Sequence, residues 1–276
     1  MVKTKTWIIA ACAVLLTIVF ASVGCASSQE PATTTIPGLT STTETTTTSL
    51  PSTETSPTST TTTMVTTTLA VTTTLRTSTT GVPVPAFEWS IQPIDAGLEA
   101  EMLQSGAWRP GVPASMDELL LIRVTHWGFD GKVHTGRLVV NGDWAEKLGT
   151  VFLALYEARF PIKSIQLIDA YGADDERSMA ADNSSAFNGR YVSGRSVWSM
   201  HAYGLAVDIN PVENPWVDGA DVSPASGRRY VDRSLKAPGM IHAGDAVVQA
   251  FESIGWKWGG YWSGIKDYQH FSSNGR

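Results

Sequence analysis

The chain has 276 residues, a net charge of −6 and two cysteines. The acidic balance and the lack of a basic stripe argue against nucleic acid as a partner. Both cysteines, Cys12 and Cys25, fall within the first 25 residues, so the rest of the chain has neither a disulfide framework nor thiolate ligands for a metal. Any metal bound there must be held by histidine and carboxylate side chains.

The first 25 residues predict an export signal. Lys3 and Lys5 precede an apolar run of about 15 residues, which is shorter than the ~20 that a helix needs to cross a bilayer. The run ends in a lipobox-like Ser22-Val23-Gly24-Cys25, which resembles the ends of bacterial lipoprotein signals, where the cysteine becomes the acylated first residue. This predicts export to the bacterial cell envelope and lipid anchoring through Cys25 to the outer face of the membrane. Ser22 stands where leucine is more usual, so a plain secretory signal is the alternative.

Residues 26–84 predict a disordered tether. Of the 50 residues from 31 to 80, 32 are serine or threonine and none is aromatic. Such a segment lacks the apolar surface that would offset the entropy of ordering. As a flexible coil, its r.m.s. span is about 40 Å. An anchored domain on this tether would sample a volume of cell wall just outside the membrane.

Residues 85–276 are enough for one folded domain. Two runs rich in Leu, Val and Ile, at 119–127 and 132–141, flank the turn signal Phe129-Asp130-Gly131 and predict a β-hairpin. Asp143, with Glu146 three residues later, predicts the capped start of a helix. The apolar stripe of that helix falls at helical spacing and consists of Leu148, Val151, Phe152 and Leu155.

The rest of the domain is predicted to mix short strands, loops and one more helix. Residues 164–169 predict a strand, residues 171–198 a loop-rich stretch, and residues 245–254 a second amphipathic helix that Gly255 ends. The helices interrupt the strands instead of alternating with them regularly, which is not the pattern of a parallel sheet. The predicted fold class is therefore α+β, a single domain with a small antiparallel sheet and packed helices.

Two segments carry the residue types of a metal site. His201 and Asp208 lie seven residues apart in an apolar run, and about sixty residues later Asp267 and His270 supply a second carboxylate and a second imidazole. His201, Asp208 and His270 form a three-ligand set, which is the number typical of a catalytic zinc that leaves its fourth position to water. Asp267 is then a spare carboxylate. Residues three apart on a regular strand face opposite sides, so Asp267 must lie at a bend, with His270 on the strand after it.

The remaining histidines are interpreted differently. His126 and His134 lie at the edges of the predicted hairpin, and His242 lies just before the second helix. None of them is part of a histidine–carboxylate pair of this kind. We therefore interpret them as ordinary strand-end or surface histidines.

Five motifs follow one another in order over about residues 120–271. They are Phe187-Asn188-Gly189-Arg190, the Ser-x-His-x-x-Gly-x-Ala-x-Asp run from Ser199 to Asp208, Asn210-Pro211 with Asn214-Pro215, Gly255-Trp256-x-Trp258-Gly259-Gly260, and Asp267-Tyr268-Gln269-His270-Phe271. In these motifs the sequence resembles the zinc-dependent peptidases of bacterial cell walls. That family includes D-alanyl-D-alanine carboxypeptidases and L-alanyl-D-glutamate endopeptidases.

The resemblance implies a zinc metallopeptidase that hydrolyses peptidoglycan stem peptides in a cleft where His201, Asp208 and His270 hold Zn²⁺. It gives Asp267 the role of general base and then general acid. Arg190 would face the cleft and stabilise a carbonyl oxygen that becomes anionic, and a surface salt bridge is its alternative. Several other residues are candidate substrate contacts for which packing roles are equally open, namely Ser199, Asn210, Trp216, Tyr261 and Trp262.

Two other functions remain open from the sequence. One is a catalytically inactive, zinc-containing module that binds the cell wall, although a spare carboxylate such as Asp267 has no use in it. The other is a mucin-like adhesin in which the threonine-rich tract is the functional part, although this leaves the five motifs unexplained. Which peptide bond is cleaved depends on loops that the sequence does not place.

Overall fold

The computed structural model describes residues 84–276. The predicted export signal, Cys25 and the predicted tether lie outside the described residues. Within them the predicted α+β class is confirmed, but the strands form three small antiparallel sheets instead of one. None of the helices in the described part of the chain is long and apolar enough to cross a membrane.

The first sheet has the order β1-β2-β3 and contains the predicted hairpin. Strands β2 (Leu119–Trp127) and β3 (Val133–Asn141) pair in antiparallel register, and Gly131 takes a positive φ of 70° in the turn between them. The edge strand β1 (Trp89–Pro93) was not predicted. The helix α1 (Ala96–Ser105), which also was not predicted, follows β1 directly.

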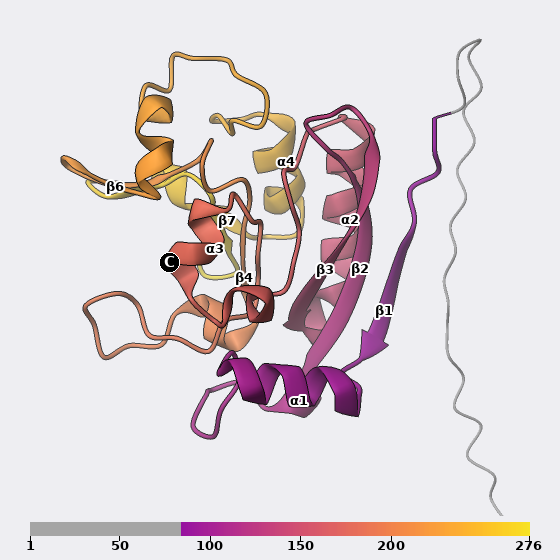
Figure 1. The fold of residues 1–276 in the computed structure, drawn as a ribbon. Helices are drawn as coiled ribbons and strands as arrows, with labels where there is room; N and C mark the ends of the chain where they lie inside the picture. Colours follow the sequence, from indigo (N-terminus) through magenta and orange to yellow (C-terminus); the bar gives the residue numbers. More distant parts are fainter. Residues whose placement is uncertain (1–83) are drawn as a thin grey trace, which may run out of the picture. The chain divides into compact units, whose positions relative to one another are not determined.

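The long helix α2 (Gly142–Glu157) packs on this sheet, and Figure 1 shows it lying along β2 and β3. Its predicted apolar stripe is confirmed, because all four side chains are buried. The predicted capping box at Asp143 is wrong. The N-cap is Asn141, whose side chain accepts a hydrogen bond from the Asp143 amide at 3.1 Å, since the helix begins immediately after β3 ends.

The predicted strand at residues 164–169 is also wrong. Only Ile165 forms a β-bridge, with Ser184, and the chain then turns into the 3₁₀ helix η2 (Ile168–Tyr171). The buried Asn183 side chain accepts from the Gln166 amide at 2.8 Å and donates to the Gln166 carbonyl at 3.0 Å. These bonds use the backbone groups that a strand partner would need. The stretch predicted to be loop-rich contains one short helix, α3 (Asp175–Ala180).

The predicted second helix is confirmed as α4 (Ala246–Ser253), and it packs against α2. The Asp245 side chain caps it by accepting from the amides of Val247 and Val248. Gly255, with a φ of 86°, lets the chain leave the helix and enter β7 (Lys257–Trp258).

Two further sheets carry the C-terminal half of the domain. One has the order β4-β9-β7, with β4 (Ala206–Asp208) and β9 (His270–Ser272). The other has the order β6-β5-β8, with β6 (Asp221–Ser223), β5 (Trp216–Asp218) and β8 (Lys266–Asp267). The remaining helical turns are η1 (Met116–Glu118), η3 (Met200–Tyr203), η4 (Ala225–Tyr230) and η5 (Gly259–Tyr261).

The main hydrophobic core joins α2 and α4 to strand β9. Phe271 is fully buried, and its ring stacks on that of Phe251 in α4 with 4.0 Å between the ring centroids. Burial of a phenylalanine side chain contributes about 1.5–3 kcal/mol. Because Phe271 directly follows His270, this packing also sets the position of a candidate metal ligand.

Candidate metal centre

The structure brings together the three residues that were predicted as ligands. The ligand atoms of His201, Asp208 and His270 all lie within 4.8 Å of one another, and the residues are only 3 to 6% exposed. His201 lies in η3, Asp208 ends β4 and His270 begins β9. In the described residues this is the one group of three or more such side chains close enough to share an ion.

The pairing of β4 with β9 places Asp208 opposite His270. They are direct cross-strand partners in the antiparallel register, and Asp208 Oδ1 lies 2.9 Å from His270 Nδ1. Asp208 is held from its other side by two backbone hydrogen bonds with Ser185. The carboxylate is therefore fixed by a ladder and not by a flexible loop.

A capped helical turn presents the remaining histidine. The Ser199 side chain caps η3 by accepting from the His201 amide at 3.4 Å, and Gly204 leaves the turn with a φ of 67°. There is no room for a side chain at Gly204, because a Cβ would lie 2.5 Å from the Asn141 backbone nitrogen. Close contact with the end of β3 thus fixes the turn that carries His201.

The outward-facing nitrogens of both imidazoles contact backbone carbonyls. His201 Nδ1 donates to the carbonyl oxygen of Ala186, and His270 Nε2 donates to that of Arg276 at 3.2 Å. A neutral imidazole that donates from one nitrogen has its lone pair on the other. In that neutral form, His201 Nε2 and His270 Nδ1, which are 3.3 Å apart, would both turn lone pairs toward an ion bound beside Asp208. This arrangement fits a divalent metal such as zinc, whose histidine ligands are oriented in this way.

The charges within the group support the same conclusion. Burial alone would raise the pKa of Asp208, but His201 and His270 outweigh it and lower that pKa, so the carboxylate is ionised. Burial alone would lower the pKa of His270, but the hydrogen bond and charge of Asp208 outweigh it and raise that pKa. A buried carboxylate that favours a proton on the neighbouring His270 equally attracts a cation.

Asp267 lies next to this group but in a different sheet. It ends β8, and two bend residues, Tyr268 and Gln269, separate it from His270 in β9. The predicted change of direction between Asp267 and His270 is thus present, although the bend follows Asp267 instead of containing it. Asp267 Oδ1 is buried and has no hydrogen-bond partner among the described residues.

The environment of Asp267 favours its protonated form. Burial, with a smaller contribution from the negative charge of Asp208, raises its pKa to about 7, although His270, His201 and Arg190 act in the opposite direction. A carboxyl group with a pKa near neutrality is suited to accept and then return a proton. A metal cation beside it would lower this pKa, because an opposite charge favours the ionised form.

Gly259 allows the close approach of Asp267. A Cβ at residue 259 would lie 2.5 Å from the Asp267 carbonyl oxygen and 2.9 Å from its Cβ. The following Gly260 lies against the Trp258 indole, where a Cβ would come within 2.3 Å of the ring. The two glycines of the predicted motif therefore act by close packing against Asp267 and Trp258.

The structure places Arg190 near Asp267 and also in a salt bridge. Its guanidinium lies 2.7 Å from the carboxylate of Asp175 in α3, which realises the alternative considered for this residue. Its positive charge still lowers the pKa of Asp267. Its Nε atom is buried and has no partner within residues 84–276. Arg190 is thus held near the candidate acid–base residue by Asp175.

The candidate substrate contacts have different environments. Asn210 is fully buried with a φ of 45°, and its side chain bonds the backbone of Lys163, Pro161 and Gly239, which favours a structural role. Ser199 is occupied in capping η3. The Trp262 ring lies 5.6 Å from the His270 ring, centroid to centroid. Trp216 is half-buried in β5 and Tyr261 is exposed.

The other histidines lie outside the metal group, as interpreted from the sequence. His126 and His134 stack on each other across β2 and β3, with 5.7 Å between the ring centroids. His134 Nε2 also contacts Asp130 at 2.9 Å. His242 Nε2 donates to the Leu235 carbonyl at 2.8 Å.

Three parts of the site were not predicted. These are the Ala186 and Arg276 carbonyls, which orient the two imidazoles, and Asp175, which pairs with Arg190. Backbone carbonyls have no signature in a sequence, because every residue has one. Asp175 lies in the stretch predicted to be loop-rich, and its spacing from Arg190 gives no indication of contact.

The geometry defines the class of site as a buried His-Asp-His group that can hold a metal ion. A model of the D-alanyl-D-alanine carboxypeptidase family matches residues 193–273, a segment that contains His201, Asp208, Asp267 and His270. Arg190 lies before it, and the segment covers less than a third of the chain. No curated protein and no solved structure matches the chain.

Proposed function

We propose that the protein is a zinc metallopeptidase that hydrolyses peptidoglycan stem peptides. The observation that carries the proposal is the buried group of His201, Asp208 and His270 inside the segment that matches a D-alanyl-D-alanine carboxypeptidase family. The matched family supports carboxypeptidase action at the terminal D-alanine. Endopeptidase action between L-alanine and D-glutamate is the other specificity that the motifs allow.

The donor set supports zinc as the cofactor. His201 Nε2, His270 Nδ1 and an oxygen of Asp208 would hold the ion, and three protein ligands leave one position for water or substrate. When bound, zinc lowers the pKa of a water molecule and polarises the scissile carbonyl. Ala186 and Arg276 keep both imidazoles in the required tautomer by accepting from their outer nitrogens.

The neighbouring side chains support the proton transfers of hydrolysis. Asp267 would take the proton of the attacking water and return it to the leaving amine, and its unpaired Oδ1 is free to accept. Arg190 would stabilise the carbonyl oxygen as it becomes anionic, with Asp175 keeping the guanidinium in place. Because Asp267 Oδ1 is buried, nearby charges act on it more strongly than they would in water.

The location of the protein is part of the proposal. A lipid anchor at Cys25 and a long tether would place the domain near its substrate in the cell envelope. This part rests on the lipobox-like residues 22–25 and on the composition of residues 26–84.

Digestion of purified peptidoglycan, followed by mass analysis of the fragments, tests the proposed activity. We expect zinc-loaded protein to release terminal D-alanine, and a chelator to stop the release until zinc is added back. Cleavage between L-alanine and D-glutamate would assign the endopeptidase specificity instead. If zinc-loaded protein binds peptidoglycan and cuts no stem peptide, the function is that of an inactive wall-binding module.

A further inference from the structure

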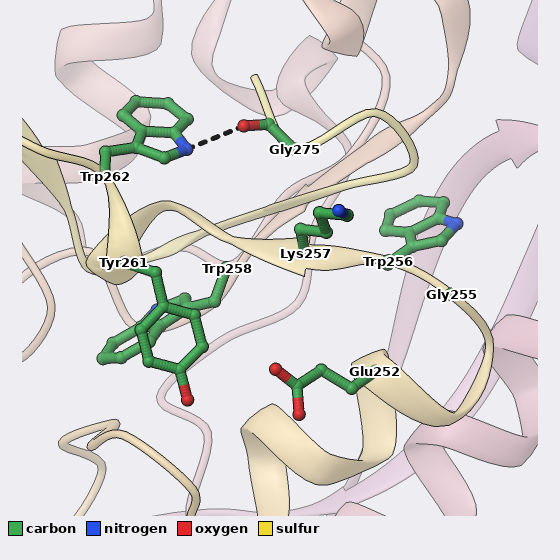
Figure 2. Close-up of a pocket in the computed structure, with 8 residues that line it drawn as sticks. All are labelled: Glu252, Gly255, Trp256, Lys257, Trp258, Tyr261, Trp262 and Gly275. Atoms are coloured by element: carbon green, nitrogen blue, oxygen red, sulfur yellow. Dashed lines mark hydrogen bonds between the residues drawn. The ribbon is translucent and has the colours of Figure 1, made fainter.

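A cavity of about 460 Å³ opens beside the metal centre, and Figure 2 shows the side chains around it. It is formed by the end of α4, strand β7, the turn η5 and the C-terminal turn at Gly275. Its main lining residues are Glu252, Lys257, Trp258, Tyr261, Trp262 and Gly275. A volume of this size is within the range of sites that bind small molecules.

One wall of the cavity is an exposed aromatic ring on a rigid support. Tyr261 is 52% exposed, although its ring meets the ring of the buried Trp258 edge to face, with 5.1 Å between the centroids. Trp258 is itself fixed, because its indole donates to the Tyr268 carbonyl at 2.7 Å and Gly260 packs directly against it. The free face of Tyr261 is thus held in place without being covered (Figure 2).

The lining of the cavity also carries one acid and one base. Glu252 and Lys257 are both exposed, and within residues 84–276 neither charged group takes part in an ion pair or a side-chain hydrogen bond. The alkyl part of Lys257 packs on Gly275, where a Cβ would lie 3.0 Å from its Cδ. Because the two charges cancel, the lining as a whole offers hydrogen bonds but no net charge to attract an ion.

Trp262 connects the cavity to the metal centre. Its indole nitrogen donates to the Gly275 carbonyl at 2.7 Å, a bond drawn in Figure 2, and its ring centroid lies 5.6 Å from that of His270. A ligand in the cavity is therefore separated from a candidate metal ligand by a single indole ring. A long substrate reaching the metal centre could occupy both places at once.

From this geometry we propose that the cavity is a saccharide subsite, which binds a sugar of the glycan strand that carries the stem peptide. The apolar face of a sugar ring, made of C–H groups, packs on an exposed aromatic ring such as Tyr261. Its hydroxyl and amide groups match the acceptor and the donor that Glu252 and Lys257 provide. A neutral, hydroxyl-rich ring fits a wall whose charges cancel better than a charged amino acid does. The inference rests on the proposed function for the identity of the whole substrate.

Direct binding of a sugar is the first test. The probe is the N-acetylglucosamine tetrasaccharide, titrated into the full chain while tryptophan fluorescence or heat is recorded. We expect saturable binding that Tyr261→Ala weakens about tenfold, the loss that corresponds to one stacking contact. Tyr261→Phe keeps the ring and should keep the affinity. Phe129→Ala, which removes an exposed aromatic from the β2–β3 turn, is the matched control and should bind as the parent does.

The role in the reaction is the second test, with two substrates that share one stem peptide. One carries the peptide alone, and the other carries it on a glycan disaccharide. We expect Tyr261→Ala to raise KM for the glycan-linked substrate about tenfold more than it raises KM for the free peptide. Lys257→Ala is a second variant, which removes a hydrogen-bond donor from the lining of the cavity and should raise the same KM.

The outcomes separate this inference from the proposed function. If the parent cleaves stem peptides but shows no Tyr261-dependent preference for sugar, the saccharide subsite is refuted and the peptidase function stands. If the tetrasaccharide binds through Tyr261 and no stem peptide is cut, the subsite stands and the peptidase function fails. If Tyr261→Ala binds the free peptide more weakly than the parent does but binds the sugar equally well, the cavity binds peptide and the inference is wrong.

Discussion

Asp267 and His270 are three residues apart, but their surroundings suit them to different work. His270 Nδ1 lies 2.9 Å from Asp208 Oδ1 and 3.3 Å from His201 Nε2, whereas Asp267 Oδ1 has no partner in the described residues. We therefore expect Asp267→Asn to keep about one zinc per chain and to lower cleavage by about a hundredfold to ten-thousandfold, the usual contribution of general acid–base catalysis. His270→Ala should lose zinc and activity together.

The comparison needs zinc content and cleavage rate measured side by side on each variant. His134→Ala is the control, because it removes a histidine outside the metal group and should leave both quantities unchanged. Full activity in Asp267→Asn would contradict the assignment of Asp267 as the acid–base residue.

A second buried carboxyl group makes the fold sensitive to pH. Glu213 is 6% exposed, and its burial, together with the negative charge of the nearby Asp182, raises its pKa from 4.5 to about 7. The folded protein therefore binds this proton more tightly than the unfolded chain does. This proton's contribution to the free energy of unfolding is fully present below pH 4.5. It is lost as the pH rises through 7, and the loss amounts to about 1–3 kcal/mol.

We expect Glu213→Gln to remove this pH dependence, because the amide is neutral at every pH. The variant should be more stable than the parent at pH 8 and should approach it at pH 4.5, as measured by denaturant unfolding at both pH values. Glu157→Gln, at an exposed residue near the end of α2, is the control and should follow the parent. Parallel pH profiles of parent and Glu213→Gln would contradict the effect.

At the scale of elements, η5 and β8 are pressed together at Gly259. A methyl group there would meet the Asp267 backbone at 2.5 Å, so Gly259→Ala must displace β8. We expect its cleavage rate to fall about a hundredfold, since a shift of about 1 Å in a catalytic group has this effect. Zinc content should persist, because the three ligands lie in other elements. Gly264→Ala is the control: its added methyl meets no atom within 4 Å, so it strains only the backbone and should cleave normally.

The elements that were predicted correctly are those with a strong periodic pattern. The hairpin β2–β3 and the helices α2 and α4 bury continuous stripes of side chains, which the sequence displays directly. The helix α1 was missed because it buries only Leu98 and Met102. The strand expected at residues 164–169 was wrong because Asn183, a residue distant in sequence, takes its backbone hydrogen bonds.

The site follows the same rule. His201, Asp208 and His270 could be proposed because the residue types and spacing of a metal site are visible in the sequence. Their arrangement in space could not be predicted, because the pairing of Asp208 with His270 joins two strands that are 62 residues apart in the sequence. The carbonyls that select the imidazole tautomers also depend on this long-range packing.

At the scale of the whole molecule, the proposed anchor determines where the domain works. If Cys25 is acylated as in bacterial lipoproteins, two or more acyl chains hold the protein in the membrane. A single acyl chain would bind the membrane only marginally. We expect Cys25→Ser to release the protein from the detergent-extractable membrane fraction into the soluble envelope fraction, as followed by immunoblotting. Unchanged retention of Cys25→Ser would show that the protein is attached in another way.

The pairing of β4 with β9 also bears on how the domain unfolds. An ion held by Asp208 and His270 would bind only the folded chain, so it should raise the free energy of unfolding by about 2.7 kcal/mol at a hundredfold excess over its Kd. We expect the melting temperature to rise with free zinc in the parent and to stay constant in His270→Ala. A melting temperature that does not respond to zinc in the parent would contradict binding at this site.

Residues 84–276 contain no cysteine, and the ion would join two strands across a loop of about sixty residues, as a disulfide can do. Unlike a disulfide, this cross-link can be removed without a reductant, simply by withdrawing the metal. When zinc becomes scarce, the protein would lose its resistance to proteolysis along with the proposed activity. Zinc supply would then control how long each molecule survives.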